Sequence, residues 1–106
     1  MDTRKTLSQS QALNLAREYK RVITPRFKSE PKVYLYGSYS KGCPNPDSDI
    51  DVAVILPHIK DDEWLETSAD LVHDGWKVNN LIEPVLMEEN EDSILYHDIM
   101  RTGIAI

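Results

Sequence analysis

The sequence predicts an α+β fold in which helices pack on a small mixed β-sheet. Short runs of β-branched and aromatic residues occur at 32–36, 50–56 and 81–87, and the segments around them carry apolar residues at helical spacing. A chain of 106 residues buries one modest core and is too short for a doubly wound sheet. We therefore expect a single domain over residues 1–106.

The first helix is predicted to begin after the capping candidates Ser8 and Ser10. Pro25 disfavours helical geometry at the preceding residue, so the helix should end or kink there, with a connector over residues 27–31. The side chains at helical spacing, which should face the core, are Ala12, Leu15, Ala16, Tyr19 and Ile23.

Two strands are predicted to follow the first helix, at residues 32–36 and 50–56. The first runs directly into Gly37 and Ser38, a pair typical of a tight turn. Residues 42–47 hold one Gly, two Pro, one Asn and one Asp, which indicates a loop between the strands.

The remainder of the chain is predicted as helix, strand and helix, at residues 61–77, 81–87 and 91–102. Pro84 removes a backbone donor, so its strand should lie at a sheet edge or carry a bulge. Gly103 should end the last helix. The inward side chains expected for the two helices are Trp64, Leu65, Leu71, Val72 and Trp76, and Ile94, Leu95 and Ile99.

The net charge of −6 divides unevenly along the chain. Residues 1–41 carry nine Lys/Arg and three Asp/Glu (+6), whereas residues 42–106 carry three and fifteen (−12). General nucleic-acid binding depends on positive charge, so it is not expected of this protein.

The apolar run 52–56 is far too short to span a membrane, Met1–Lys5 opens no signal peptide, and the single Cys43 excludes an internal disulfide. We expect a cytoplasmic protein.

Asp49 and Asp51 are the first indication of chemistry. Residues two apart on a strand share a face, so these carboxylates would repel each other at the start of an apolar strand. Such a pair needs a cation, and oxygen ligands at this spacing suit Mg²⁺. Glu83 is out of pattern among the apolar residues of its strand face and would be tolerated as a metal ligand or as a base near one.

Gly37 and Ser38 are the second indication. A glycine at a strand end lets backbone N–H groups approach a phosphate, the Ser38 hydroxyl adds a donor, and the amides of a following helix would assist. Lys41 supplies a positive charge one helical turn later. Each feature alone is common in structural turns and strand ends, and the order strand, Gly-Ser, loop, Asp-x-Asp, strand favours function. His58, His73 and His97 show no metal-ligand spacing.

The segment GSYSKGCPNPDSDIDVAVIL resembles the signature of the DNA polymerase beta-like nucleotidyltransferase superfamily, and in particular its minimal nucleotidyltransferases. The resemblance extends over residues 10–105. It implies a polymerase beta palm-like core in which Gly37 and Ser38 hold the triphosphate. Asp49 and Asp51 would bind Mg²⁺, and Glu83, with Glu88 as its rival, would be the third acid. Lys41 and Ser48 complete the predicted nucleotide site, and Tyr39 stands where the family usually has Arg.

The expected activity is Mg²⁺-dependent transfer of a nucleoside monophosphate from a nucleoside triphosphate, with ATP as the expected donor, to an acceptor hydroxyl. Asp49, Asp51 and Glu83 are the predicted catalytic and metal-binding residues. The resemblance further implies a HEPN-domain toxin as partner and acceptor, with this chain as its antitoxin. One alternative is a vestigial antitoxin that acts only by binding its partner. The other is a small-molecule, antibiotic-type nucleotidyltransferase acting as a homo-oligomer.

Overall fold

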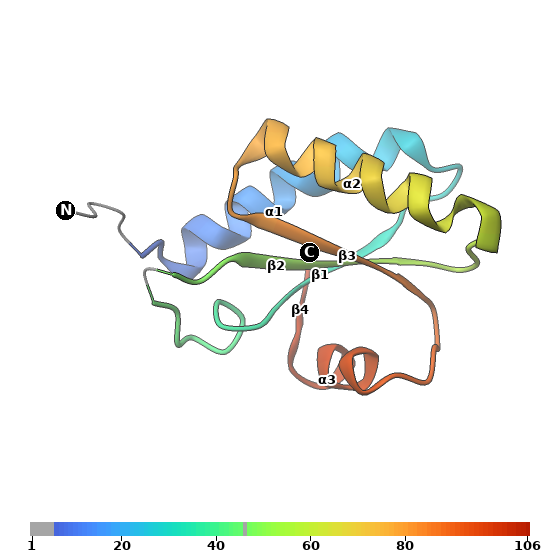
Figure 1. Cartoon of the computed structure of the whole chain (residues 1–106). Coiled ribbons are helices and arrows are strands. Elements are labelled where there is room, and N and C mark those ends of the chain that lie inside the picture. Colours follow the sequence, from blue (N-terminus) through green and yellow to red (C-terminus); the bar gives the residue numbers. More distant parts are fainter. Residues whose placement is uncertain (1–5, 46) are drawn as a thin grey trace.

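The computed structural model describes residues 6–45 and 47–106, so Met1–Lys5 and Pro46 of the predicted loop lie outside the described residues. It is an α+β fold, as predicted, and its one sheet has four strands (Figure 1). The elements in chain order are α1 (Gln9–Ile23), η1 (Thr24–Arg26), β1 (Lys32–Tyr36), β2 (Ile50–Leu56), η2 (Asp61–Glu63), α2 (Trp64–Val78), β3 (Ile82–Glu88), α3 (Ile94–Thr102) and β4 (Ile104–Ala105).

The strand order is β3-β2-β1-β4. β1 runs antiparallel to both β2 and β4, and β2 runs parallel to β3, so the sheet is mixed as predicted. Pro84 lies on the edge strand β3, which confirms the edge position expected for it. The short strand β4 was not predicted from the sequence. Its two residues pair with β1.

The larger core lies between the sheet and the pair α1 and α2, which cover the same face (Figure 1). Ser8 caps α1: the Gln11 N–H donates to Ser8 Oγ at 3.0 Å, and the Ser8 N–H donates to Gln11 Oε1 at 2.8 Å. The helix ends at Ile23, and Pro25 sits in the 3-10 turn that follows, as expected. Four of the five predicted inward side chains are fully buried, namely Ala12, Ala16, Tyr19 and Ile23, whereas Leu15 is half-buried.

The prediction for the inner face of α2 was largely wrong. Leu71 is buried, but Leu65 is 82% exposed and Trp76 is 59% exposed. The residues that α2 does bury are Leu71, Asp74 and Gly75, because Gly75 lets the helix approach Ile82 of β3, to which a Cβ at this glycine would come within 3.3 Å. Close contact here turns the bulkier side chains outward.

The prediction for α3 needs a similar correction. The helix begins at Ile94 rather than at residue 91, because Ser93 caps it by accepting the Tyr96 N–H at 3.1 Å. Ile94 is 91% exposed and Leu95 is also exposed, whereas Ile99 is fully buried as predicted and Tyr96 is buried beside it.

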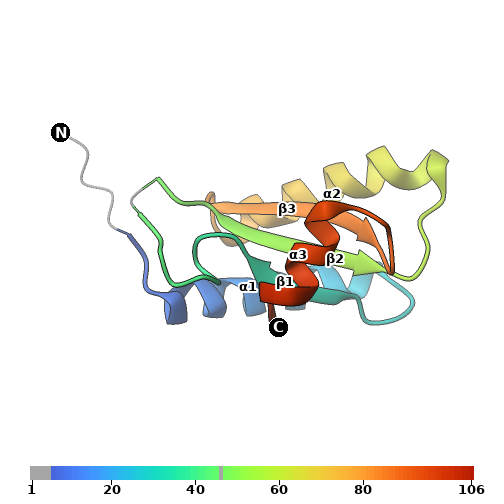
Figure 2. The same cartoon turned by 90° about the horizontal axis from the view of Figure 1, so that it is seen from below.

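α3 covers the second face of the sheet, opposite α1 and α2, as the view from below shows (Figure 2). Its side chains Tyr96 and Ile99 pack with Ala53, Ile55 and Met87 to form a smaller core. No helix in the described part of the chain is both long and apolar enough to cross a membrane.

Candidate active site

Three carboxylates, two of them on neighbouring strands, define the candidate site. Asp51 of β2 pairs with Glu83 of β3 in the parallel register and with Tyr36 of β1 in the antiparallel register. Directly paired residues share a sheet face, and here it is the face on which α3 packs. Asp51 is half-buried and Glu83 is exposed, so α3 leaves this end of the face accessible. Asp49 is exposed just before β2.

The pKa shifts show that these acids act on one another. Burial, and then the charge of Asp49, raise the pKa of Asp51. A hydrogen bond with Asp49 raises the pKa of Glu83, with burial and the charges of Asp49 and Asp51 adding to it. Burial, Asp51 and Glu83 raise the pKa of Tyr36 to about 12. Asp49, Asp51 and Glu83 therefore share one region of negative potential.

This set of donors fits a hard divalent cation by its chemistry, because each ligand offers carboxylate oxygens and the ionised forms of Asp51 and Glu83 are destabilised by burial and by neighbouring acids. Within residues 6–45 and 47–106, no three Asp, Glu, His or Cys side chains already enclose a metal position. A cation would therefore have to draw the three carboxylates together.

The Gly37–Ser38 turn lies beside the carboxylates. Gly37 has φ +76°, and its carbonyl accepts the Lys41 N–H at 3.1 Å and the Ser40 hydroxyl at 2.9 Å. The Cys43 N–H donates to the Ser38 carbonyl at 3.1 Å. Residues 37–42 thus form a series of turns, and the helix that was expected to point its amides at a phosphate is absent from this described segment.

Tyr39 anchors this turn to α1, a role that the sequence did not reveal. Its side chain is 1% exposed, and its hydroxyl accepts the Leu7 N–H at 3.2 Å. Its carbonyl accepts Gln9 Nε2 at 2.8 Å. A lone aromatic residue within the polar segment 38–48 was the available signal.

The other predicted nucleotide-binding residues have structural partners. Lys41 Nζ lies 3.5 Å from Asp98 Oδ2 of α3. Ser48 is buried, and its hydroxyl accepts the Asn45 N–H at 2.9 Å, which closes the loop before Asp49.

Glu88, the rival third acid, is placed elsewhere. It pairs with Leu56 at the far end of the parallel ladder, and its Oε1 accepts the Ile59 N–H at 2.8 Å. Of the two glutamates, Glu83 is the one beside Asp51 in the sheet.

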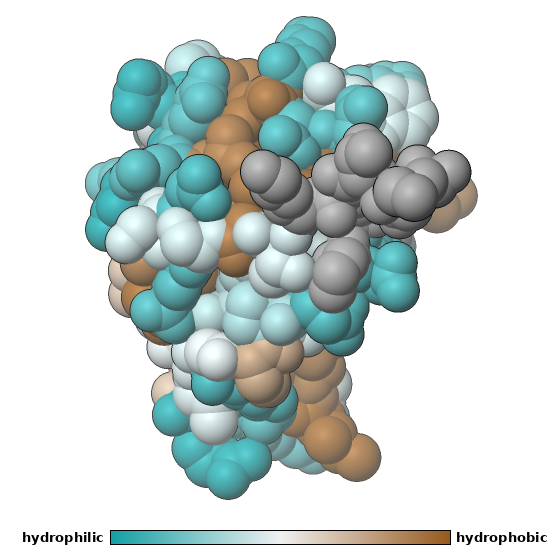
Figure 3. All heavy atoms as spheres, turned by 90° about the vertical axis from the view of Figure 1, so that its left-hand side faces the viewer, coloured by the Kyte–Doolittle hydropathy of each residue, from teal (hydrophilic) through white to brown (hydrophobic). Residues whose placement is uncertain are grey.

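The candidate site is accessible to solvent, because Asp49 and Glu83 are exposed. Figure 3 looks onto the end of the molecule from which the Gly37–Ser38 turn and the start of β2 are reached, and hydrophilic side chains surround its apolar strips. Two hollows, of about 410 and 370 Å³, lie elsewhere, against Lys20, Glu30 and Ile106, and neither is lined by a predicted site residue.

A mixed sheet that carries a glycine turn and clustered carboxylates at adjacent strand ends is the arrangement of a nucleotidyltransferase domain. The family model described as "Polymerase beta, Nucleotidyltransferase" matches residues 21–106, most of the chain. The chain belongs to this family.

A solved structure shares the fold. A candidate nucleotidyltransferase from Sulfolobus solfataricus superposes with a TM-score of 0.67 at 22% identity, over 92% of this chain and 80% of that one. Two variants of the toxin–antitoxin MntA-HpeT give TM-scores of 0.48 and 0.49 at 20% and 21% identity, over 93% and 94% of this chain and 72% of theirs. No curated protein matches the sequence.

Proposed function

We propose that this chain transfers a nucleoside monophosphate from a nucleoside triphosphate, with ATP as the expected donor, to an acceptor hydroxyl and releases pyrophosphate. The observation that carries the proposal is the cluster of Asp49, Asp51 and Glu83 beside the Gly37 turn, in a chain of the polymerase beta family. Mutually repelling carboxylates on an accessible sheet face are costly unless they serve a cation.

Asp49, Asp51 and Glu83 would hold Mg²⁺ through their carboxylate oxygens. When bound, Mg²⁺ neutralises the charge that develops on the phosphates during transfer. The Gly37–Ser38 backbone and the Ser38 hydroxyl would donate hydrogen bonds to the triphosphate. Lys41 would exchange its Asp98 partner for a phosphate oxygen, since their 3.5 Å pair is exposed and weak.

Glu83 would orient the acceptor and receive its proton. Its side chain is the more exposed of the two paired acids, so an acceptor hydroxyl can reach it. The acceptor oxygen forms a bond to the α-phosphorus while the bond from that phosphorus to the oxygen of the β-phosphate breaks. The proton passes to Glu83, and pyrophosphate leaves with the bonding electrons.

For the acceptor, we propose a hydroxyl on a partner protein, with this chain as the antitoxin of a toxin, in the manner of a HEPN pair. The exposure of Asp49 and Glu83 supports this, because a large partner could cover the end of the sheet face that α3 leaves accessible. The two rival functions are binding of the toxin without transfer, and modification of a small molecule by a homo-oligomer. The geometry of the candidate site does not favour either rival function.

Transfer is tested with triphosphate labelled at the α or at the γ position, with Mg²⁺ or with EDTA, in the presence of a co-expressed HEPN-domain protein as the partner. We expect α label on the acceptor, no γ label, and no transfer in EDTA. Asp51→Asn should reduce transfer by about 100-fold or more, because electrostatic stabilisation is usually the largest catalytic contribution. Glu18→Gln, an exposed change on α1, is the matched control and should leave transfer unchanged.

Undiminished α transfer by folded Asp51→Asn would show that the site is misassigned. If the wild-type chain protects cells from the partner without transfer, and Asp51→Asn protects equally well, the chain acts by binding alone. Label on a small molecule rather than on the partner would favour the third function.

A further inference from the structure

The outward side of α2 carries an uncovered apolar stripe. Leu65, Ala69, Val72 and Trp76 follow one another at intervals of four, three and four residues, the spacing by which one helix packs along another. Leu65 is 82% exposed and Trp76 is 59% exposed. None of the four belongs to either apolar core of the described chain. Val72 is half-buried and the other three are exposed, so this fold leaves most of the stripe uncovered.

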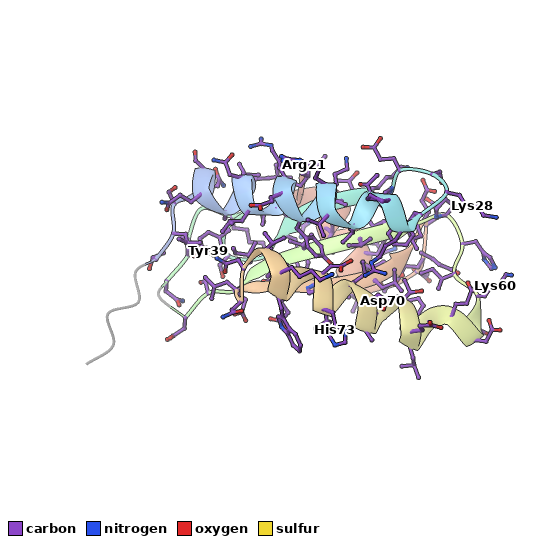
Figure 4. All side chains as sticks on the ribbon, turned by 90° about the horizontal axis from the view of Figure 1, so that it is seen from above. Arg21, Lys28, Tyr39, Lys60, Asp70 and His73 are labelled. Atoms are coloured by element: carbon purple, nitrogen blue, oxygen red, sulfur yellow. The ribbon has the colours of Figure 1, made fainter. Side chains whose placement is uncertain are left out.

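The side chains of α2 that are labelled in Figure 4 show which way this stripe faces. Asp70 lies on the side of α1, where its carboxylate is 3.6 Å from Arg26 Nη1. His73 points away from α1, and its ring is 5.3 Å from that of Trp76 between centroids. The stripe thus lies on the flank of α2 turned away from α1, and α1 cannot cover it.

Negative charge borders the stripe at its N-terminal half. Asp61, Asp62, Glu63 and Glu66 are all exposed, and within the described part of the chain none of them forms an ion pair. At the other end, Lys77 is already paired with Asp74 at 3.3 Å. A second copy of this chain would bring these acids together, and each copy carries a net charge of −6.

We propose that this surface, the α2 stripe with its acidic border, binds an amphipathic helix of a partner protein whose apolar seam is flanked by Lys or Arg. The four stripe residues would pack against the seam, and the four acids would meet the basic flanks. Basic flanks would attract the acidic border, whereas a second copy of this chain would repel it, so charge favours the partner helix over a second copy. Because α2 and the candidate active site lie on opposite faces of the sheet, this proposal does not depend on nucleotide transfer.

The probe is a synthetic helical peptide with Leu at its a and d positions and Lys at its e and g positions. Its counterpart has Glu at e and g. Fluorescence anisotropy of labelled peptide against the full chain, at physiological salt, should show saturable binding of the Lys peptide only. Leu65→Ser and Trp76→Ser should each weaken it at least tenfold. Both side chains are exposed, so both variants should keep the fold, which circular dichroism checks.

Ile94→Ser is the matched control, since Ile94 is an equally exposed aliphatic side chain on α3, and it should leave peptide binding unchanged. Asp51→Asn should also leave it unchanged, which separates this surface from the carboxylate cluster. The proposal is overturned if neither peptide binds, if both bind equally, or if Ile94→Ser weakens binding as much as Leu65→Ser. Sedimentation showing a dimer that Leu65→Ser dissolves would assign the stripe to a second copy and overturn it as well.

Discussion

The carboxylate of Asp51 occupies the space where any other residue at position 37 would place its Cβ. A Cβ on Gly37 would overlap Asp51 Oδ2 and would lie 3.3 Å from Asp51 Cγ. Gly37 also has φ +76°, a conformation that L side chains rarely adopt. The glycine is therefore required twice, once by the turn and once by the carboxylate beside it.

Gly37→Ala should be more harmful than Gly42→Ala, and the difference measures the overlap with Asp51. Gly42 has φ +74°, but a methyl group added to it would meet nothing within 4 Å, so its substitution should cost about 1–2 kcal/mol for backbone strain alone. Gly37→Ala adds displacement of the carboxylate, so it should lose more stability and also Mg²⁺-dependent triphosphate binding. Urea unfolding and titration calorimetry check both. Equal losses in the two variants would mean that Asp51 moves aside freely.

In the metal-free protein, the contribution of Asp51 and Glu83 to the free energy of unfolding should fall as the pH rises through the acid range. The native state raises the pKa of Asp51 above its ordinary 3.8 and that of Glu83 above 4.5, so it binds protons more tightly than the unfolded chain does. This contribution is fully present below the ordinary values and is lost as the pH rises through the raised ones. Asp51→Asn removes the part of this pH dependence that comes from Asp51. At neutral pH the variant should therefore be more stable than the wild-type protein. Urea unfolding in EDTA from pH 4 to 7 tests this, and an unchanged pH slope in Asp51→Asn would contradict it.

The strands and the proximity of the candidate-site residues could be predicted because local signals and tertiary structure agree there. Runs of β-branched residues ended at Gly37 and before Pro57, and the same-face spacing of Asp49 and Asp51 required no knowledge of the fold. That Glu83 rather than Glu88 lies beside Asp51 depends on strand register, which the sequence left open. The strand β4 is only two residues long and is stabilised by its pairing with β1.

The faces of α2 and α3 could not be predicted from apolar spacing. In α2 both flanks are apolar, and the inner one is chosen by the small Gly75 and by Asp74, which is buried because Arg26 reaches it. In α3 the position of Ser93 as the cap sets the helical phase and turns Ile94 outward. The contacts of Gly75 and Asp74 that orient α2 are long-range, whereas the cap that fixes the start of α3 lies only three residues from its partner.

The orientation of α3 is tested by comparing two isoleucines on this helix. Ile99 is fully buried, so Ile99→Ala should cost about 2–5 kcal/mol through lost burial and the cavity that it leaves. Ile94 is 91% exposed, and Ile94→Ala should change the free energy of unfolding by less than about 0.5 kcal/mol. Urea unfolding gives both values. A larger effect at Ile94 would support the inward orientation that the sequence predicted.

The last prediction concerns Asp74, a buried carboxylate far from the candidate active site. Its side chain is 2% exposed, and it accepts hydrogen bonds from Arg26 through Nε and, at 2.9 Å, through Nη2. The hydrogen bond from Arg26 is the main cause that holds the pKa of Asp74 below its ordinary value of 3.8. Arg26→Leu would leave the buried charge with the largely exposed Lys77 alone.

We expect Arg26→Leu to lower the free energy of unfolding at neutral pH by about 1–3 kcal/mol, less than for a fully buried pair because Arg26 is itself 38% exposed. The lowered pKa means that the native state binds fewer protons than the unfolded chain, so this stability is present above the ordinary value and is lost as the pH falls through the folded one. The difference in the free energy of unfolding between wild type and variant should therefore narrow as the pH falls below 3.8. Urea unfolding at several pH values measures it, with Arg21→Leu, an exposed cation on α1, as the control. If the difference in the free energy of unfolding between wild type and Arg26→Leu were as large in acid as at neutral pH, Arg26 would stabilise the fold by packing rather than through the charge of Asp74.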